Sequence, residues 1–356
     1  HGLGDWEPST KKLPRGLSYI AKEALKRKVD FGIWLEPEMV NPQSELYQKH
    51  PDWIITQPKR TPILGRHQEI LDLTRPEVQA FEWQVIDKTL RPNPDISYVK
   101  WDCNRYITQP GSGYLQPAEQ SHLWIDYNWA LYRLMERFSK EFPNVMAMLC
   151  AGGSGRVDYG ALPYFHSFWP SDNTDPLGRI KIQWGFSHFF PASTISAHVT
   201  RMGKRHLKLA IDVALSGAFG IDLALDKATA EERVQIADAV KLYKASIRPL
   251  VMQGELYRLV SPYEHPMASL SYVSTDKNDA VVYLYQIQDG SVPQVILGGL
   301  DARKNYRVEE VGLPKGSTSR FPGHGKIFSG AELMSTGIAN PLNAQFESAI
   351  LLLKTQ

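Results

Sequence analysis

The feature that most constrains the fold is a regular alternation of short apolar strands and amphipathic helices through the first two thirds of the chain. Segments such as DFGIWLEPEM (residues 30–39) and SYVKWDC (residues 97–103) have high β-propensity, and each follows a helical pattern. Strands that alternate with helices form parallel βαβ units. We count six such units, and every strand ends in polar or ionisable residues, as in a (β/α)8 TIM barrel with its active site at the carboxyl ends of the strands.

The pattern changes near Ser261. Beyond it, short strands such as AVVYLYQI and AILLLKT are separated by Asp-Gly, Gly-Gly and Pro-Lys-Gly breakers, without a helical period. We therefore predict two domains, a partial (β/α)8 barrel over residues 1–260 and a C-terminal antiparallel β-sandwich domain over residues 261–356. The last barrel helix should begin at Thr229, which forms a capping box with Glu232.

Composition excludes several classes of protein. The net charge of +2 provides no field that would favour nucleic acid or an anionic membrane surface. No apolar run reaches the roughly 18 residues of a membrane span, and the opening HGLGDWEPSTKK is not patterned as a signal peptide. The two cysteines, Cys103 and Cys150, exclude a disulfide framework and give no metal-ligand spacing. We therefore expect no nucleic-acid partner, no membrane partner and no metal.

One strand end combines unusual side chains. Lys100, Asp102 and Asn104 are spaced by two residues, so they should point to one face of the strand. Trp101 and Cys103 should point to the opposite face. An ammonium, a carboxylate and an amide that converge at a strand end form a candidate polar site.

The other strand ends add carboxylates and tryptophans, namely Trp34, Glu36, Glu38, Cys150 with the following AGGSGR, Trp169, Asp172, Asn173 and Asp175. Two carboxylates among such groups fit glycoside hydrolysis, in which a retaining enzyme places a nucleophile and an acid/base about 5 Å apart. Asp102 suits the nucleophile, because the nearby Lys100 cation would keep it ionised. Asp172 suits the acid/base, because the apolar Phe168 and Trp169 would raise its pKa.

The same residues could have purely structural roles. In one interpretation Lys100 and Asp102 form a structural ion pair, and in another the residues from Asp172 to Asp175 cap the next helix. Cys150 alone would be a small buried side chain. Glu36 and Glu38 are better interpreted as hydrogen-bond acceptors than as catalytic groups.

Five ordered motifs carry a family resemblance: GIWLEPEMVNPQSELYQKHPDW, GRHQEILDLTRPEV, YVKWDCNR, LCAGGSGR and WPSDNTD. With them, the chain closely resembles glycoside hydrolase family 36, the α-galactosidases of microbial type, from LGDW near the start to SGAELMSTGI near the end. The resemblance implies a (β/α)8 barrel, a C-terminal antiparallel β domain and a retaining double displacement without metal or organic cofactor. It also implies an α-galactoside oligosaccharide as substrate and an association of copies in the full-length enzyme.

The resemblance also implies roles for individual residues. The nucleophile falls on Asp102, and the acid/base falls on Asp172 rather than on Asp175. Galactose-binding residues fall on Trp34, Arg66, Lys100 and Asn104, the turn near the 2-hydroxyl falls on Cys150 and Gly153, and Trp169 is expected to wall the same pocket.

The chain departs from the family in one large respect. Family members usually carry an N-terminal β domain, the first two barrel strands and an Asp pair for the galactose 4- and 6-hydroxyls before LGDW, and this sequence contains none of them. We therefore expect a fragment of a larger enzyme that cannot close its barrel and is inactive alone, because unpaired strand edges would be exposed.

Four other activities compete with α-galactoside hydrolysis: α-N-acetylgalactosaminidase activity, galactosyl transfer to a sugar, sugar binding without catalysis and metal-dependent sugar isomerisation. Cys150 and the glycines after it favour a hydroxyl over an N-acetyl group. The presence of both Asp102 and Asp172 disfavours a non-catalytic protein. His166, His188 and His198 form no ligand pattern with Glu36 or Glu38, which disfavours the isomerase.

Overall fold

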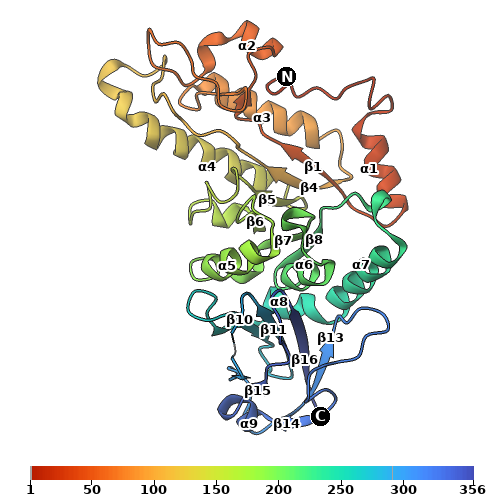
Figure 1. The fold of residues 1–356 in the computed structure, drawn as a ribbon. Helices are drawn as coiled ribbons and strands as arrows, with labels where there is room; N and C mark the ends of the chain where they lie inside the picture. Colours follow the sequence, from red (N-terminus) through yellow and green to blue (C-terminus); the bar gives the residue numbers. More distant parts are fainter. Residues whose placement is uncertain (1, 291) are drawn as a thin grey trace. The chain divides into compact units, whose positions relative to one another are not determined.

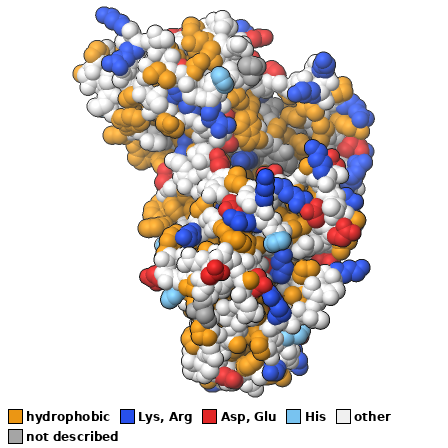
Figure 2. Space-filling view, viewed as in Figure 1, with side chains coloured by type: hydrophobic (Ala, Val, Ile, Leu, Met, Phe, Trp, Pro, Cys, Tyr) orange, Lys and Arg blue, Asp and Glu red, His pale blue; other side chains and the backbone are white. Residues whose placement is uncertain are grey.

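A computed structural model describes residues 2–290 and 292–356, and Figure 1 shows it as a ribbon. The chain divides into two compact units, His1–Trp169 and Pro170–Gln356. The predicted division into residues 1–260 and 261–356 differs from this one and stays a prediction. On the face in Figure 2, Lys and Arg side chains are interspersed with Asp and Glu side chains. Within the described residues, no helix has both the length and the apolar character that crossing a membrane requires.

The first unit is built on a parallel sheet with the strand order β1-β4-β5-β6. These strands are β1 (Phe31–Leu35), β4 (Ile96–Trp101), β5 (Met146–Leu149) and β6 (Ser167–Phe168). Trp34 on β1 is paired in register with Lys100 on β4, which in turn is paired with Met148 on β5. Because the strands are parallel, the residues that follow them gather at one edge of the sheet.

Helices cover this sheet, and two short strands pair beside it. The helices are α1 (Gly16–Lys26), α2 (Glu45–Lys49), α3 (Pro76–Leu90) and α4 (Leu123–Glu141), and the short antiparallel strands are β2 (Met39–Val40) and β3 (Glu69–Ile70). Helix α4 buries Tyr127, Leu131, Leu134 and Phe138, which recur at the spacing of one helical face. Trp101 of β4 packs edge-on against Phe138, with 6.1 Å between ring centroids.

The second unit begins with the remaining strand–helix repeats. Its elements are α5 (Pro176–Phe186), β7 (Ser196–Val199), α6 (Leu207–Ala214), β8 (Ala218–Ile221), α7 (Ala230–Leu242), a π-helical turn (Tyr243–Ile247) and α8 (Arg248–Gln253). Strands β7 and β8 pair in parallel. The predicted capping box is confirmed, because Thr229 accepts from the Glu232 amide and the Glu232 side chain accepts from the Thr229 amide.

A six-stranded antiparallel sheet with the order β14-β13-β16-β11-β10-β9 follows in the same unit. These strands are β9 (Glu255–Val260), β10 (Met267–Val273), β11 (Asp279–Gln286), β13 (Asn305–Val311), β14 (Ile327–Ser329) and β16 (Ser348–Thr355). A separate pair is formed by β12 (Gln294–Val295) and β15 (Ile338–Ala339). The antiparallel sheet thus includes β9, which precedes Ser261. The expectation that no helix follows Ser261 is wrong, because Ser329 caps the short helix α9 (Gly330–Ser335).

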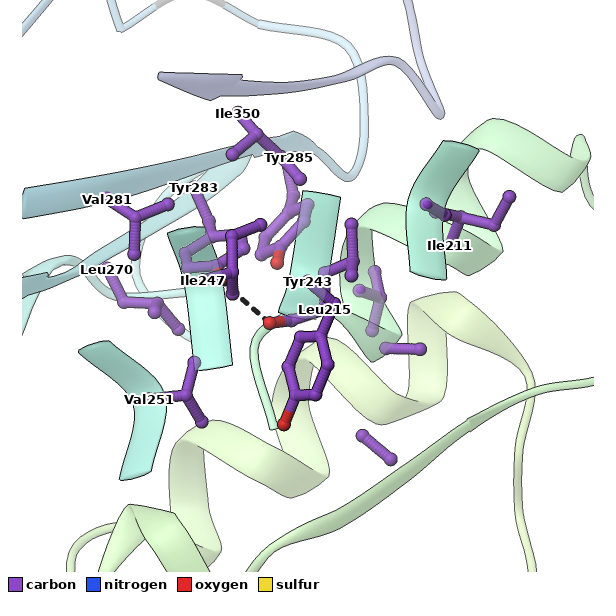
Figure 3. Packing of buried hydrophobic residues seen from close by; sticks show 14 of the residues in the cluster. Ile211, Leu215, Tyr243, Ile247, Val251, Leu270, Val281, Tyr283, Tyr285 and Ile350 are labelled. Carbon is purple, nitrogen blue, oxygen red and sulfur yellow. Dashed lines mark hydrogen bonds between the residues drawn. The ribbon is translucent and has the colours of Figure 1, made fainter. Parts of the chain in front are cut away.

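Tyrosines of the antiparallel sheet join it to helix α6, as Figure 3 shows for part of this core. Tyr283 donates its hydroxyl to the Leu215 carbonyl over 2.8 Å, and Tyr272 donates to the Ser216 carbonyl over 2.8 Å. The last carbonyls of a helix have no partner within it. The sheet therefore supplies hydrogen bonds that the end of α6 lacks, and it buries apolar surface at the same place.

Candidate active site

Asp102 lies directly after β4 and is only 4% exposed. Its Oδ2 accepts from the indole N–H of Trp34 over 2.9 Å, and its Oδ1 accepts from the backbone N–H of Cys103 over 2.9 Å. The side chains of Asn104 and Cys150 also donate to it. Burial alone would raise the pKa of Asp102, but these hydrogen bonds outweigh burial and hold the pKa below its ordinary value of 3.8. The carboxyl is therefore an anion at neutral pH.

Lys100 lies on the same strand face as Asp102, and its Nζ lies 5.2 Å from the centroid of the Trp169 ring. The main causes of the lowered pKa of Asp102 are hydrogen bonds, rather than the Lys100 cation that the sequence suggested. Trp169 is buried and clusters with Met148 and Cys150. Lys100 and Trp169 thus border the side of the site that lies toward β5 and β6.

The thiol of Cys150 is a hydrogen-bond donor, not a nucleophile. It is 1% exposed, and burial raises its pKa to about 12. The turn that follows needs glycine, since Gly152 and Gly153 have φ of 57° and 97°. The backbone N–H of Gly152 donates to Asn104 Oδ1 over 3.2 Å. The turn therefore reaches Asp102 both through Cys150 and through Asn104.

Glu36 directly follows β1 and contacts the chain after Asp102. Its Oε1 accepts from the backbone N–H of Asn104. Burial raises its pKa to about 6; the Asn104 amide opposes this rise, and the neighbouring Asp102 charge adds to it. Glu36 therefore accepts a hydrogen bond that fixes the chain after Asp102, in agreement with the sequence interpretation.

Arg66 occupies a two-residue turn between Gly65 and Gln68, whose amides and carbonyls pair over 3.2 and 2.9 Å. Arg66 and His67 both have positive φ, 54° and 59°, as a type I′ turn requires. Such conformations cost of order 1–3 kcal/mol each for non-glycine residues and cluster at functional sites. The exposed Arg66 guanidinium lowers the pKa of Glu36, a smaller effect than the burial that raises it. Arg66, which the sequence predicted as a site residue, thus lies in a strained turn, and its positive charge lowers the pKa of Glu36.

Asp172 lies in the second unit, on the loop between β6 and α5, and is exposed. Asp175, the alternative acid, is ion-paired with Arg205 at 3.4 Å. It precedes α5 without making a side-chain cap hydrogen bond. A Cβ at position 203 would lie 2.1 Å from Asp175 Oδ1, so the Gly203 backbone closes over that carboxylate. Asp175 is therefore held in place within this loop.

Glu38 is a buried carboxylate in the first unit, and the sequence did not predict its partners. Glu38 is fully buried and accepts hydrogen bonds from Trp101, Tyr127 and Arg156. The interpretation of Glu38 as an acceptor is confirmed, but Arg156 was missed. Its signal was available, since it closes the run AGGSGR. Within residues 2–290 and 292–356, no His, Cys, Asp and Glu side chains form a group that could hold a metal ion.

Comparison with known proteins gives two family matches. Residues 1–254 match Melibiase, and residues 267–353 match the glycosyl hydrolase family 36 C-terminal domain. The chain is 39% identical over 348 residues to alpha-galactosidase AgaA of Geobacillus stearothermophilus, covering 95% of this chain and 46% of that protein. It is 34% identical to alpha-galactosidase 2 of Hypocrea jecorina, covering 100% and 47% respectively. The chain thus spans about half the length of these relatives.

Solved structures agree with the predicted fold class. The crystal structure of the GH36 alpha-galactosidase AgaB from Geobacillus stearothermophilus superposes with a TM-score of 0.92 at 38% identity, covering 100% of this chain and 48% of that one. The related AgaA has been crystallised in complex with raffinose, in a form that matches this chain with a TM-score of 0.91 at 37% identity and covers 100% of it and 49% of that chain. The barrel fold with a C-terminal antiparallel β domain is confirmed.

Proposed function

Because the chain belongs to glycosyl hydrolase family 36, we propose that it supplies the catalytic groups of a retaining α-galactosidase. Its substrate is a terminal α-galactosyl residue of an oligosaccharide. The observation that carries the proposal is the state of Asp102, an almost fully buried carboxylate that four donors keep ionised. A buried carboxylate that is already ionised and oriented by hydrogen bonds can act as a nucleophile without first losing a proton.

Two carboxyl groups divide the chemistry. Asp102 attacks the anomeric carbon as the glycosidic C–O bond breaks, and Asp172 gives its proton to the departing oxygen. This leaves a galactosyl ester on Asp102 and an anionic Asp172. Asp172 then takes a proton from water, which attacks the anomeric carbon and frees Asp102. Two inversions give net retention of configuration.

The remaining predicted residues bind the sugar in this proposal. Trp34 is 41% exposed, so its indole can present a face to a sugar while its N–H is held by Asp102. The other binding groups are Arg66, Lys100, Asn104, Cys150, Gly153 and Trp169. The buried thiol and the two positive-φ glycines at the Cys150 turn leave no flexible side chain to move aside, which favours a 2-hydroxyl over an N-acetyl group.

The ligands of a related enzyme support an oligosaccharide substrate, since structures of AgaA variants contain raffinose and stachyose. The test is hydrolysis of raffinose by the protein at its full natural length, with proton NMR of the first galactose anomer released. We expect α-galactose first, and loss of turnover in Asp102→Asn but not in Asp95→Asn, a control at the opposite end of β4. Initial release of β-galactose would refute retention, and faster cleavage of an α-N-acetylgalactosaminide would favour that alternative. Raffinose binding without turnover would favour a non-catalytic protein.

A further inference from the structure

Glu38 connects the segments that carry site residues, since it follows β1 and accepts hydrogen bonds from β4 and from the loop after β5, as well as from helix α4. It follows β1, which bears Trp34, and it is fully buried. Its Oε1 accepts from Trp101 Nε1 over 3.2 Å, and its Oε2 accepts from the Tyr127 hydroxyl over 2.6 Å. The two terminal guanidinium nitrogens of Arg156 donate to it, one to each oxygen, with the Nη1 bond at 2.7 Å. Paired bonds of this kind fix orientation as well as distance.

Arg156 belongs to the loop that supplies one donor to Asp102, Cys150, and holds a second donor, Asn104. The loop leaves β5 at Cys150, whose N–H donates to the Trp101 carbonyl over 2.8 Å. Cys150 donates to Asp102 directly. Gly152 holds Asn104 through its backbone N–H, and Asn104 donates to Asp102. Displacement of this loop would therefore weaken two of the hydrogen bonds that keep Asp102 ionised.

The sequence of the loop of residues 150–156 makes it costly to order. Three of its residues are glycines, which lose more conformational freedom on ordering than any other residue. Its internal backbone bonds include Ala151 N–H to the Gly153 carbonyl at 2.9 Å and Val157 N–H to the Ser154 carbonyl at 3.1 Å. The Arg156 side chain reaches out of the loop to a buried partner, Glu38, in the turn between β1 and β2.

We propose that the Arg156–Glu38 ion pair is a positioning device for the nucleophile, which sets the loop of residues 150–156 so that Cys150 and Asn104 donate to Asp102. The inference rests on the proposed function, since it concerns the same carboxylate. Arg156 acts through the loop and does not touch the reacting atoms.

Stability alone does not account for such a pair. Replacing a buried ion pair by apolar side chains is often neutral or stabilising, because burial of two charges is costly. A second carboxyl, Glu82 of α3, is buried beside the pair, and burial and then the Glu38 charge raise its pKa well above its ordinary value. Burial thus disfavours the charged form of Glu82, and the Arg156 charge lies in a direct ion pair with Glu38. The ion pair fixes the position of the loop of residues 150–156 relative to Glu38.

The test is the pH profile of kcat/KM for α-galactoside hydrolysis in the full-length protein, comparing wild type with Arg156→Lys. Lysine keeps the charge and loses the paired geometry. We expect kcat/KM to fall by about 10- to 100-fold, because a small misplacement of catalytic groups has an effect of this size. We also expect the acidic limb, which reports the free nucleophile, to move up by about 0.5 to 1 pH unit. The matched control is Arg137→Lys, which alters an exposed pair with Glu141 on α4 and should leave the profile unchanged.

The titratable groups around Asp102 are Glu36 after β1, Lys100 on β4 and Cys150 after β5. Because Glu36 also titrates below neutral pH, with a pKa raised to about 6, the profile is repeated in a Glu36→Gln background, where the upward shift should persist. If Arg156→Lys does not fold, Tyr127→Phe decides, since it removes one donor to Glu38 and should move the limb in the same direction by less.

An acidic limb that stays at the wild-type position in the folded variant, with or without lost activity, would overturn the positioning role. Wild-type protein that does not hydrolyse α-galactosides would instead refute the proposed function. The two failures are therefore distinct, because the first requires an active wild type.

Discussion

Trp34 donates its indole N–H to Asp102 Oδ2 over 2.9 Å, and the two residues are 68 positions apart in the sequence. The bond joins the end of β1 to the end of β4, which are neighbouring parallel strands. One indole thus stabilises the buried carboxylate and also has a face that remains exposed.

Trp34→Phe should raise the pKa of Asp102, because it removes a donor to the anion while burial remains. A hydrogen bond to a charged group contributes about 1.5–3 kcal/mol, so kcat/KM should fall by about tenfold or more. The pH profile of kcat/KM, with its acidic limb displaced upward, is the measurement. Trp129→Phe on α4 is the control, since that ring is exposed. Identical limbs in both variants and wild type would argue against the role of the indole.

Asp172→Ala should lose far more activity on raffinose than on aryl α-galactosides with good leaving groups. The sugar leaving group of raffinose needs a proton from the acid, whereas a good aryl leaving group does not. Asp175→Asn serves as the comparison, since that carboxylate is paired with Arg205. Steady-state rates on both substrates check this. An equal loss on both substrates in Asp172→Ala would move the acid/base role elsewhere.

Glu36 should make stability depend on pH. Its pKa is raised to about 6 from an ordinary value of 4.5, chiefly by burial, so ionisation costs more in the folded protein than in the unfolded chain. The protein should therefore lose about 2 kcal/mol relative to Glu36→Gln as the pH rises from about 4 to about 7. Urea denaturation of both proteins across that range measures the difference. A difference that stays constant, or grows in favour of wild type, would contradict this account.

Glu38→Gln and Glu82→Gln should differ sharply in stability although both carboxyls are buried. The first leaves the Arg156 charge without its hydrogen-bonded counterion, at a cost of about 3 kcal/mol. The second removes a carboxyl whose charged form burial disfavours, and among the described residues neither Glu82 oxygen has a hydrogen-bond partner to lose. Thermal unfolding of the two variants side by side ranks them. A larger loss in Glu82→Gln would show that the charges are assigned wrongly.

Periodicity predicted the elements well where a segment is long or its cap is explicit. The strand at Ile96–Trp101, the helix that Thr229 caps and the strands β10, β11 and β16 all follow from their patterns. Short elements were missed, as α9 shows, because six residues carry too little periodic signal. Strand β9 was missed as well, and it gains its identity by pairing with β10.

The candidate site was predicted as a set of residues but not as a network. Spacing by two placed Lys100, Asp102 and Asn104 on one face, as the alternation of a strand requires. The bonds from Trp34 and from Arg156 cross 68 and 118 residues, and local pattern contains no information about such partners. This is why a nearby cation was expected to keep Asp102 ionised, whereas hydrogen bonds are the main cause.

The most direct test of the central claim is chemical rescue of Asp102→Ala with azide in the full-length protein. The variant lacks the attacking carboxylate but keeps Asp172, so an activated aryl α-galactoside should react only when azide enters the vacated space. The account predicts turnover that rises with azide and a β-galactosyl azide product, identified by NMR, because one displacement inverts the anomeric carbon. An α-galactosyl azide product, or near-normal hydrolysis by Asp102→Ala without azide, would show that Asp102 is not the nucleophile.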